Sequence, residues 1–305
     1  MKKVVSLSLG SSGRDKTIYT TFLDEEFTIS RIGVDGDQSR FMHRLGELDG
    51  TVDAIGFGGM DRYVMVGERR YEFVASRKLL APAVKTPVLD GSGLKNTLER
   101  TVIRQLAATQ TVDFKNAKTL MVAGVDRFGM SEALAEQGGE IVFGDLMFAL
   151  GVPIPIHGVR LHRKVARALL PLIVRMPISV LYPMGEKQNE IVPAHGKWYD
   201  WADIIAGDFH YIRRNMPTAA SGFMAGKTVI TNTITPQDMV ALKVRGVSRL
   251  ITTTPSFDGR SFGTNVMEAM CVALNRGRLL DTPEVERILA KLDWQTNVVE
   301  LDKGS

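Results

Sequence analysis

Residues 118–145, KTLMVAGVDRFGMSEALAEQGGEIVFGD, decide the fold of this chain. The apolar run 119–125 has the length and the aliphatic composition of a buried strand. A turn follows at 124–129, and from Met130 the apolar residues recur at helical spacing until a glycine pair. A second short strand is expected just before Asp145. The stretch therefore predicts a strand–helix–strand unit of a parallel α/β sheet.

This unit has the layout of a dinucleotide site, because Asp145 follows Gly124 by about twenty residues. Glycine lets a pyrophosphate approach the backbone, and N–H groups at a helix start attract it. An acid after the second strand accepts ribose hydroxyls and repels a 2′-phosphate, which favours NAD slightly over NADP. Asp126 stands where the usual pattern has glycine, and it would repel a pyrophosphate unless Arg127 neutralises it. A turn that binds no ligand is the alternative. The predicted cofactor residues here are Gly124, Asp126, Arg127, Phe128, Gly129 and Asp145.

Composition indicates an ordinary soluble globular protein, with 44% hydrophobic and 24% charged residues. The net charge of +4 is spread along the chain, which suits a small anionic ligand better than a nucleic acid. The single cysteine, Cys271, excludes an internal disulfide and suggests a reducing compartment. No stretch approaches the ~20 apolar residues of a membrane span. A cytoplasmic protein with a small-molecule substrate and no membrane partner is expected, and no metal site is visible.

The 305 residues suffice for two domains. Strands and helices alternate after the polar segment 110–116, which predicts a doubly wound parallel sheet. The expected fold is α/β, with a C-terminal Rossmann-like domain and a smaller N-terminal α/β domain. The predicted domains are a substrate domain over 1–112, a dinucleotide-binding domain over 113–280, and a C-terminal helix and tail over 281–305. Helices are expected over 38–48, 94–108 and 236–244, an extended crossover over 146–155, and a loop over 183–201.

In such a sheet, ligands sit beyond the carboxyl ends of the strands. Three polar loops of the C-terminal domain are expected there, after strands over 202–206, 227–231 and 249–253. The last, TTTPSFDGRSFGTN over 252–265, opens a helix and is a candidate anion or ribose site, with a capped surface loop as the alternative. The candidates in these loops are Thr231, Asn232, Thr253, Thr254 and Pro255 for the cofactor, and His210 and Arg260 for the substrate.

In the N-terminal domain, Lys95 and Asp90 are five residues apart across two glycines. A lysine near a carboxylate can act as a general acid or base when partial burial shifts its pKa. The alternative is an ordinary helix start with a solvated lysine. Because the segment GFGGMDR follows a buried strand, its Asp61 and Arg62 are expected to line the same cleft, together with Asn96.

The motifs GVDRFGM, FGDLMFALG, DGSGLKNT and TTTPSFDGRSFGTN resemble a poorly characterised bacterial family commonly labelled quinate 5-dehydrogenase. The layout is also similar to that of shikimate/quinate dehydrogenases, in which a smaller substrate domain precedes a nicotinamide domain. The resemblance implies a catalytic lysine–aspartate pair, here Lys95 and Asp90. It also implies that the strand end Thr253-Thr254-Pro255 lies near the nicotinamide.

The leading hypothesis is therefore an NAD(P)-dependent oxidoreductase acting on a small hydroxy acid or polyhydroxy compound. Arg62 or Arg260 would hold a substrate carboxylate as a bidentate pair. One alternative is a phosphotransferase, because residues 10–13, Gly-Ser-Ser-Gly, resemble the phosphate-binding hairpin of acetate- and sugar-kinase-like folds. Another is a non-catalytic Rossmann-like nucleotide-binding or sensor protein, suggested by the irregular glycine turn. The sequence does not decide whether the protein forms a homodimer.

Overall fold

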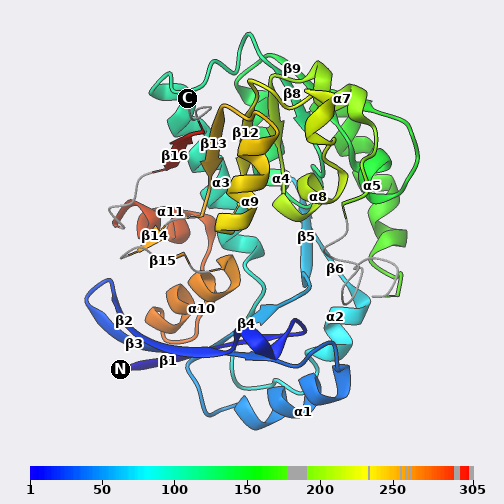
Figure 1. The fold of residues 1–305 in the computed structure, drawn as a ribbon. Helices are drawn as coiled ribbons and strands as arrows, with labels where there is room; N and C mark the ends of the chain where they lie inside the picture. Colours follow the sequence, from blue (N-terminus) through cyan, green and yellow to red (C-terminus); the bar gives the residue numbers. More distant parts are fainter. Residues whose placement is uncertain are drawn as a thin grey trace. The chain divides into compact units, whose positions relative to one another are not determined.

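The chain folds as two compact α/β units, which confirms the predicted fold class (Figure 1). Unit 1 comprises Met1–Thr97, Leu169–Lys187 and Phe262–Asp293, and unit 2 comprises Leu98–Ala168, Gln188–Ser261 and Trp294–Ser305. The chain first passes between the units at Leu98, inside a helix, whereas the sequence places the boundary after residue 112. The computed structural model describes residues 1–177, 191–232, 234–254, 256–257, 260–261, 263–291 and 296–301.

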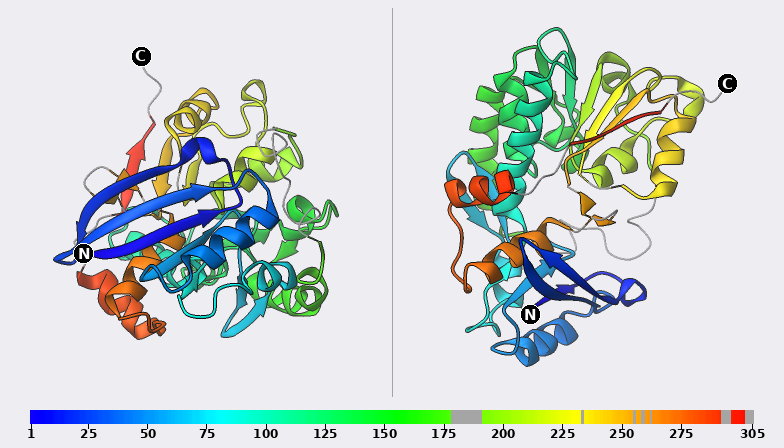
Figure 2. Two further views of the ribbon diagram at one scale, coloured as in Figure 1. Left: turned by 90° about the horizontal axis from the view of Figure 1, so that it is seen from below. Right: turned by 90° about the vertical axis from the view of Figure 1, so that its left-hand side faces the viewer.

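Unit 1 is built on a five-stranded sheet in the order β2-β3-β1-β4-β7. Strand β1 pairs in parallel with β3 and β4, β4 pairs in parallel with β7, and only the edge strand β2 runs antiparallel to its neighbour. The blue strands β1 to β3 lie side by side in the left view of Figure 2. The strands are β1 (Lys2–Ser8), β2 (Lys16–Phe22), β3 (Glu25–Gly33), β4 (Ala54–Gly58) and β7 (Val88–Leu89).

Two helices cover the two faces of this sheet. Helix α1 (Gln38–Leu48) begins after Asp37, whose carboxylate accepts the Arg40 N–H at 2.9 Å. On the face below α1, Phe41 packs edge-to-face on Phe57 of β4 at 5.4 Å. Helix α10 (Thr264–Leu274) packs on β1 and β4. Helix α10 lies against Gly56 of β4, where a Cβ would lie 3.1 Å from the Asn265 carbonyl oxygen. Gly56 and Phe57 are consecutive in the strand and face opposite sides, so α10 and α1 cover opposite faces of the sheet.

Smaller elements complete unit 1. Strands β5 and β6 form an antiparallel hairpin, and α2 begins just after it. In α1, Phe41 and Leu45 are buried and Met42 is 38% exposed. The elements are the 3₁₀ turn η1 (Ser12–Arg14), β5 (Tyr63–Val66), β6 (Arg69–Glu72), α2 (Val74–Leu79) and α11 (Thr282–Lys291); α3 (Ser92–Ala108) begins here and continues into unit 2.

Unit 2 contains a seven-stranded sheet in the order β10-β9-β8-β11-β12-β13-β16. The five central strands are parallel, and both edge strands run antiparallel. The strand order reverses between β8 and β11, which is the switch point at which such sheets bind ligands. The strands are β8 (Lys118–Met121), β9 (Glu140–Phe143), β10 (Ile156–His157), β11 (Ile204–Ala206), β12 (Thr228–Thr231), β13 (Arg249–Thr252) and β16 (Asn297–Glu300).

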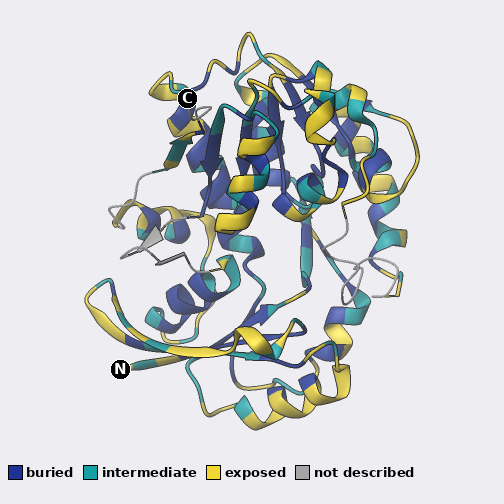
Figure 3. Ribbon diagram, viewed as in Figure 1, coloured by how far each residue is buried: buried dark blue, intermediate teal, exposed yellow. Residues whose placement is uncertain are grey.

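Helices cover both faces of the unit 2 sheet, because alternate strand residues point to opposite sides. Leu120 and Ile205 pack in the cluster with α7, α8 and α9, whereas Met121 and Ile204 pack in the cluster with α3 and α4. The strands are accordingly buried in Figure 3, and the helices expose their outer faces. The helices are α4 (Phe128–Glu136), α5 (Val159–Ile173, whose last turn belongs to unit 1), α7 (Gly196–Trp201), α8 (Phe209–Asn215) and α9 (Pro236–Val244).

The predicted strand–helix–strand unit is confirmed as β8, α4 and β9. Three expectations nearby are wrong. Part of the expected crossover is a π-helical turn, η2 (Asp145–Ala149), which buries Met147 and Phe148. The expected loop over 183–201 contains α7, and the expected C-terminal tail contains β16, since each buries apolar residues against distant parts of unit 2. The remaining elements are η4 (Ala219–Ser221), β14 (Ser256–Phe257) and β15 (Arg260–Ser261).

Among the residues that the structure describes, no helix combines the length and the apolar character needed to span a bilayer.

We predict that Gly139→Ala destabilises unit 2 more than Gly226→Ala. Both glycines have a positive φ (+81° and +74°), which costs alanine about 1 kcal/mol. At Gly139 a Cβ would also lie 2.2 Å from the Phe114 carbonyl oxygen, whereas at Gly226 it meets nothing within 4 Å. The clash should remove about 1–3 kcal/mol more of the free energy of unfolding. Thermal unfolding of both variants measures the difference, and equal melting temperatures would contradict it.

Candidate functional site

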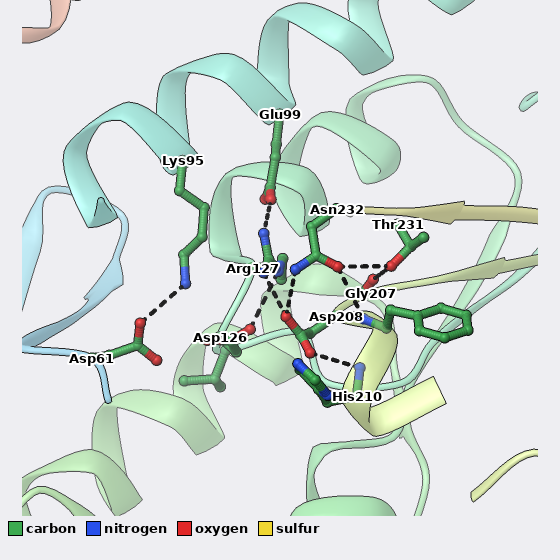
Figure 4. Close-up of polar contacts among 12 residues, drawn as sticks. Asp61, Lys95, Glu99, Asp126, Arg127, Gly207, Asp208, His210, Thr231 and Asn232 are labelled. Carbon is green, nitrogen blue, oxygen red and sulfur yellow. Dashed lines mark hydrogen bonds and ion pairs between the residues drawn. The ribbon is translucent and has the colours of Figure 1, made fainter. Parts of the chain in front are cut away.

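A buried arginine occupies the switch point of unit 2. Arg127 follows β8 as the N-cap residue of α4, and its side chain is 6% exposed. Its guanidinium contacts the carboxylate of Glu99 on α3, and its Nη2 lies 2.6 Å from Asp208 Oδ2, just after β11. Its Nε lies 3.3 Å from Asp126 Oδ2. Figure 4 shows these three carboxylates converging on the one guanidinium.

Hydrogen bonds tie this arginine cluster to the ends of β11 and β12. Asp208 caps α8, since its Oδ1 accepts the His210 N–H at 2.9 Å. Asn232 donates from Nδ2 to Asp208 Oδ2 at 2.9 Å and accepts the Phe209 N–H at 3.1 Å (Figure 4). Thr231 donates its hydroxyl to Asn232 Oδ1 at 3.1 Å. The predicted candidates Thr231, Asn232 and Arg127 therefore meet at the carboxyl ends of neighbouring strands.

The charges in the arginine cluster stabilise one another. Burial alone would lower the pKa of Arg127, but Glu99, Asp208 and Asp126 raise it well above its usual value. Burial alone would raise the pKa of Asp208, but Arg127 and His210 outweigh it and lower the pKa to about 2. Because three carboxylates surround one guanidinium, the cluster favours ligand hydroxyls or a cation over a further anion.

The glycine turn is packed by the chain itself. A Cβ on Gly124 would lie 2.6 Å from Phe143 Cδ1 and 3.0 Å from His162 Cε1, so the glycine makes room for two rings. Asp145, the predicted ribose acceptor, accepts the Val125 N–H at 2.8 Å. Its other oxygen lies 3.0 Å from Nε2 of His162, which is fully buried and stacks on Phe143. The spacing that suggested a dinucleotide site is therefore also explained by internal packing.

The start of α4 differs from the turn before it. Arg127, the N-cap residue, makes no side-chain capping hydrogen bond there. The first intrahelical bond runs from the Ser131 N–H to the Arg127 carbonyl oxygen at 3.0 Å. Phe128 and Gly129, in the first turn, are buried. Uncapped N–H groups at a helix start are the groups that bind phosphate oxygens.

Unit 1 contains a buried lysine–aspartate pair. Lys95, on α3, is 8% exposed, and its Nζ lies 3.6 Å from Oδ1 of Asp61, in the loop after β4 (Figure 4). The partner differs from the predicted one, because the carboxylate of Asp90 is used by the backbone. It accepts the N–H groups of Arg62 at 2.7 Å, Tyr63 at 2.9 Å and Ser92 at 3.1 Å. Asp90 therefore shapes the loop and the helix start, and Asp61 pairs with the lysine.

Sequence reasoning did not identify Glu268, which lies on α10 in unit 1. Its Oε2 is buried without a hydrogen-bond partner among the described residues. Burial, and after it the charge of Asp90, raises the pKa of Glu268 to about 8. The sequence signal is a single acid inside the apolar helix VMEAMCVAL. Glu99 gave a similar signal, lying beside buried apolar residues of α3, among them Leu98 and Val102.

The other predicted site residues lie in different environments. Arg62 donates from Nε to Glu72 at 3.0 Å, so a neighbour already uses the guanidinium proposed for a substrate. Asn96 Oδ1 is buried without a hydrogen-bond partner among the described residues. Thr253 and Thr254 are buried after β13, and the Thr253 N–H donates to the Thr231 carbonyl oxygen at 2.8 Å. Pro255 and the side chain of Arg260 lie outside the described residues, and His210 is exposed on α8.

These features define a two-unit α/β protein whose second unit is Rossmann-like, with polar clusters at strand ends. The chain belongs to the family described as "Domain of unknown function (DUF8754)", which matches residues 93–301. Residues 3–90 match a second family, "Domain of unknown function (DUF8753)". No curated protein matches the sequence.

Several solved structures are similar over most of the chain at low identity. An ABC transporter solute-binding protein from Burkholderia multivorans has a TM-score of 0.42 and 12% identity, covering 98% of this chain and 99% of that one. An NAD-dependent malic enzyme from Thermotoga maritima has a TM-score of 0.44 and 11% identity, covering 95% of this chain and 76% of that one. A periplasmic ribose ABC transporter from Conexibacter woesei has a TM-score of 0.40 and 11% identity, covering 95% of this chain and 94% of that one. Likenesses this weak assign no function.

We predict that Arg127→Met lowers the free energy of unfolding by about 3–5 kcal/mol, because it removes the guanidinium that neutralises the buried carboxylates of Glu99 and Asp208. Arg104→Met is the matched control. Arg104 pairs with Glu136 on the surface of the same unit, where its side chain is 54% exposed, so its loss should cost no more than about 1 kcal/mol. Urea unfolding of both variants tests this, and similar midpoints would show that the arginine cluster is not needed for stability.

We predict that Glu268→Gln stabilises the protein at alkaline pH. Between the usual carboxyl pKa of 4.5 and the raised value of about 8, the folded state keeps a proton that the unfolded chain releases. Stability from this group is therefore present at low pH and is lost as the pH rises through about 8. The difference between the melting temperature below pH 4.5 and the melting temperature above pH 8 should therefore be smaller in Glu268→Gln than in the wild type. The exposed control Glu286→Gln should keep the wild-type pH dependence; a wild-type profile in Glu268→Gln would refute the prediction.

Proposed function

We propose that the chain is an NAD(P)-dependent oxidoreductase that acts on a small hydroxy acid or polyhydroxy compound, as the resemblance to quinate and shikimate dehydrogenases suggests. The observation that carries the proposal is the Lys95–Asp61 pair, with 3.6 Å between Nζ and Oδ1 and a lysine that is 8% exposed. Buried lysines beside a carboxylate are suited to proton transfer. Asp61 follows β4 and Lys95 lies on α3 after β7, and the carboxyl ends of parallel strands are where such a sheet presents ligand-binding residues.

The chemistry assigned to this pair is the transfer of one proton. When an alcohol is oxidised, its carbon loses a hydride to the bound nicotinamide and its hydroxyl loses a proton. Lys95, as the neutral amine, would accept that proton at Nζ and become an ammonium group. Asp61 would orient Nζ and stabilise the ammonium charge. In the reverse direction, the Lys95 ammonium would return the proton to the carbonyl oxygen.

The residues of unit 2 fit a dinucleotide in part. Arg127 makes no side-chain capping hydrogen bond at the start of α4, which supports a place for phosphate oxygens near Phe128 and Gly129. The polar strand ends at Thr231 and Asn232 offer hydroxyl and amide groups for a ribose. Because Asp145 already accepts the Val125 N–H, its preference for NAD weakens, and both NAD and NADP enter the proposal.

A second candidate function, a non-catalytic ligand-binding protein, is favoured by the arginine cluster. Its three carboxylates, with Asn232 beside them, suit a hydroxyl-rich ligand better than a pyrophosphate. A phosphotransferase has less support. The N–H groups of Ser12 and Gly13 donate to Asp35 Oδ1 at 2.7 Å and Ser11 Oγ at 3.1 Å, so they are not directed at a phosphate.

We predict that the purified protein binds NADH or NADPH by calorimetry and oxidises a member of a panel of small hydroxy acids that includes quinate and shikimate. Lys95→Met should lower kcat by about 10²–10⁴-fold with unchanged dinucleotide affinity, because it removes only the proton acceptor. Asp61→Asn should lower kcat less, and Asp61→Glu should restore part of it. The exposed Lys16→Met is the control and should behave as wild type.

Each outcome decides between the candidates. No binding of either dinucleotide at millimolar concentration removes the oxidoreductase proposal. Thermal stabilisation by a polyhydroxy compound, with no turnover of any alcohol in the panel, supports the binding protein instead.

A further inference from the structure

A basic cavity lies in unit 1, beside the ion pair of Arg62 and Glu72. Its volume is about 320 Å³, and β6, α2 and the segment that follows α5 form its walls. The Val74 N–H donates to the Val174 carbonyl oxygen at 2.9 Å, which joins α2 to that segment. The cavity is lined by Arg69, Arg70, Tyr71, Glu72, Val74, Arg77, Pro171, Val174 and Arg175.

The cavity gathers positive charge that the protein does not neutralise. Four of its lining residues are arginines, and none of the four forms an ion pair with any residue that the structure describes. The one lining carboxylate, Glu72, is paired with Arg62 at 3.0 Å. All four arginines are exposed, so solvent screens the repulsion between them. An anion in the cavity would still be attracted by several guanidinium groups at once.

Two of these arginines are held against aromatic rings. The Arg69 guanidinium lies 4.8 Å from the centre of the Tyr71 ring, and the Arg70 guanidinium lies 5.8 Å from that of Tyr63. Stacking of this kind restricts a guanidinium while leaving its N–H edges available to a ligand. The cavity is therefore partly organised before any anion binds.

A second and independent observation is the hydroxyl of Tyr71. Tyr71 is 6% exposed and lines the cavity, yet its hydroxyl has no hydrogen-bond partner among the described residues. A buried hydroxyl without a partner is costly. The hydroxyl oxygen is not accessible from the cavity as the side chain stands, so a ligand oxygen would satisfy it only after a shift of the ring.

We propose that this cavity binds a compact diphosphate group, either as free pyrophosphate or as the diphosphate of a nucleotide. Arginine pairs with phosphate oxygens through two parallel hydrogen bonds, and a diphosphate offers enough oxygens for several arginines. The volume is at the lower end of small-molecule sites, which are roughly 300–1,000 Å³. The Tyr71 hydroxyl would donate to a remaining oxygen once its ring shifts toward the cavity. The site goes beyond the proposed oxidoreductase function and does not rest on it.

Calorimetric titration of the full chain with sodium pyrophosphate tests the proposal. The Arg77→Gln/Arg175→Gln double variant removes two cavity guanidiniums and should weaken pyrophosphate binding by more than about tenfold. Lys78→Gln is the matched control, since Lys78 is exposed on the same helix, carries the same charge and does not line the cavity. It should bind pyrophosphate as wild type does. Tyr71→Phe should weaken binding by a smaller factor and leave the melting temperature unchanged or higher.

Further titrations decide the identity of the ligand. ADP binding more tightly than pyrophosphate assigns the site to a nucleotide, and the reverse assigns it to the free anion. Citrate binding as tightly as pyrophosphate overturns the assignment to phosphate, as does equal pyrophosphate binding in the double variant and the wild type. NADH affinity is measured on the same variants. Loss of pyrophosphate binding with NADH binding retained separates this site from the proposed cofactor site.

Discussion

The neutralisation of buried carboxylates by Arg127 is the constraint on which the ligand end of unit 2 depends. Glu99, Asp208 and Asp126 come from three different segments, and each contacts the same guanidinium. Buried charges are tolerated only when they are paired, so these segments are held in one arrangement. Because Asp208 also caps α8 and bonds to Asn232, the arrangement extends to the ends of β11 and β12. Any ligand at the switch point meets this preformed set of charges.

The same region shows how one residue pattern can serve two purposes. A glycine after the first strand and an acid after the second are typical of dinucleotide sites. Here Gly124 admits the rings of Phe143 and His162, and Asp145 binds the turn that contains Val125. Both residues are thus explained by packing and by backbone hydrogen bonding. The N-cap residue of α4, Arg127, makes no side-chain capping hydrogen bond, a feature that the spacing of the sequence does not reveal.

Most of the fold could be predicted from local patterns, and much of the candidate site could not. The apolar runs that form β8, β12 and β13 and the segments that form α1 and α9 are regular enough to identify from the sequence. Short elements such as α7 and β16 depend on burial against distant residues. The partner of Lys95 was wrongly predicted because Asp90 is near it in sequence, whereas Asp61 is brought to it by the end of β4. Glu268 and Asp90 are far apart in the sequence, and only tertiary folding brings them into the same unit.

The packing of α10 on β1 and β4 has a consequence for biosynthesis. The strands of the first sheet leave the ribosome early, but the helix that covers one of their faces begins only at Thr264. During translation that apolar face therefore stays uncovered until residues 264–274 have also been synthesised. We therefore expect the nascent chain to bind chaperones that shield exposed sheet surfaces. Because the segments of the two units alternate along the chain, neither unit is encoded by one continuous stretch of the gene.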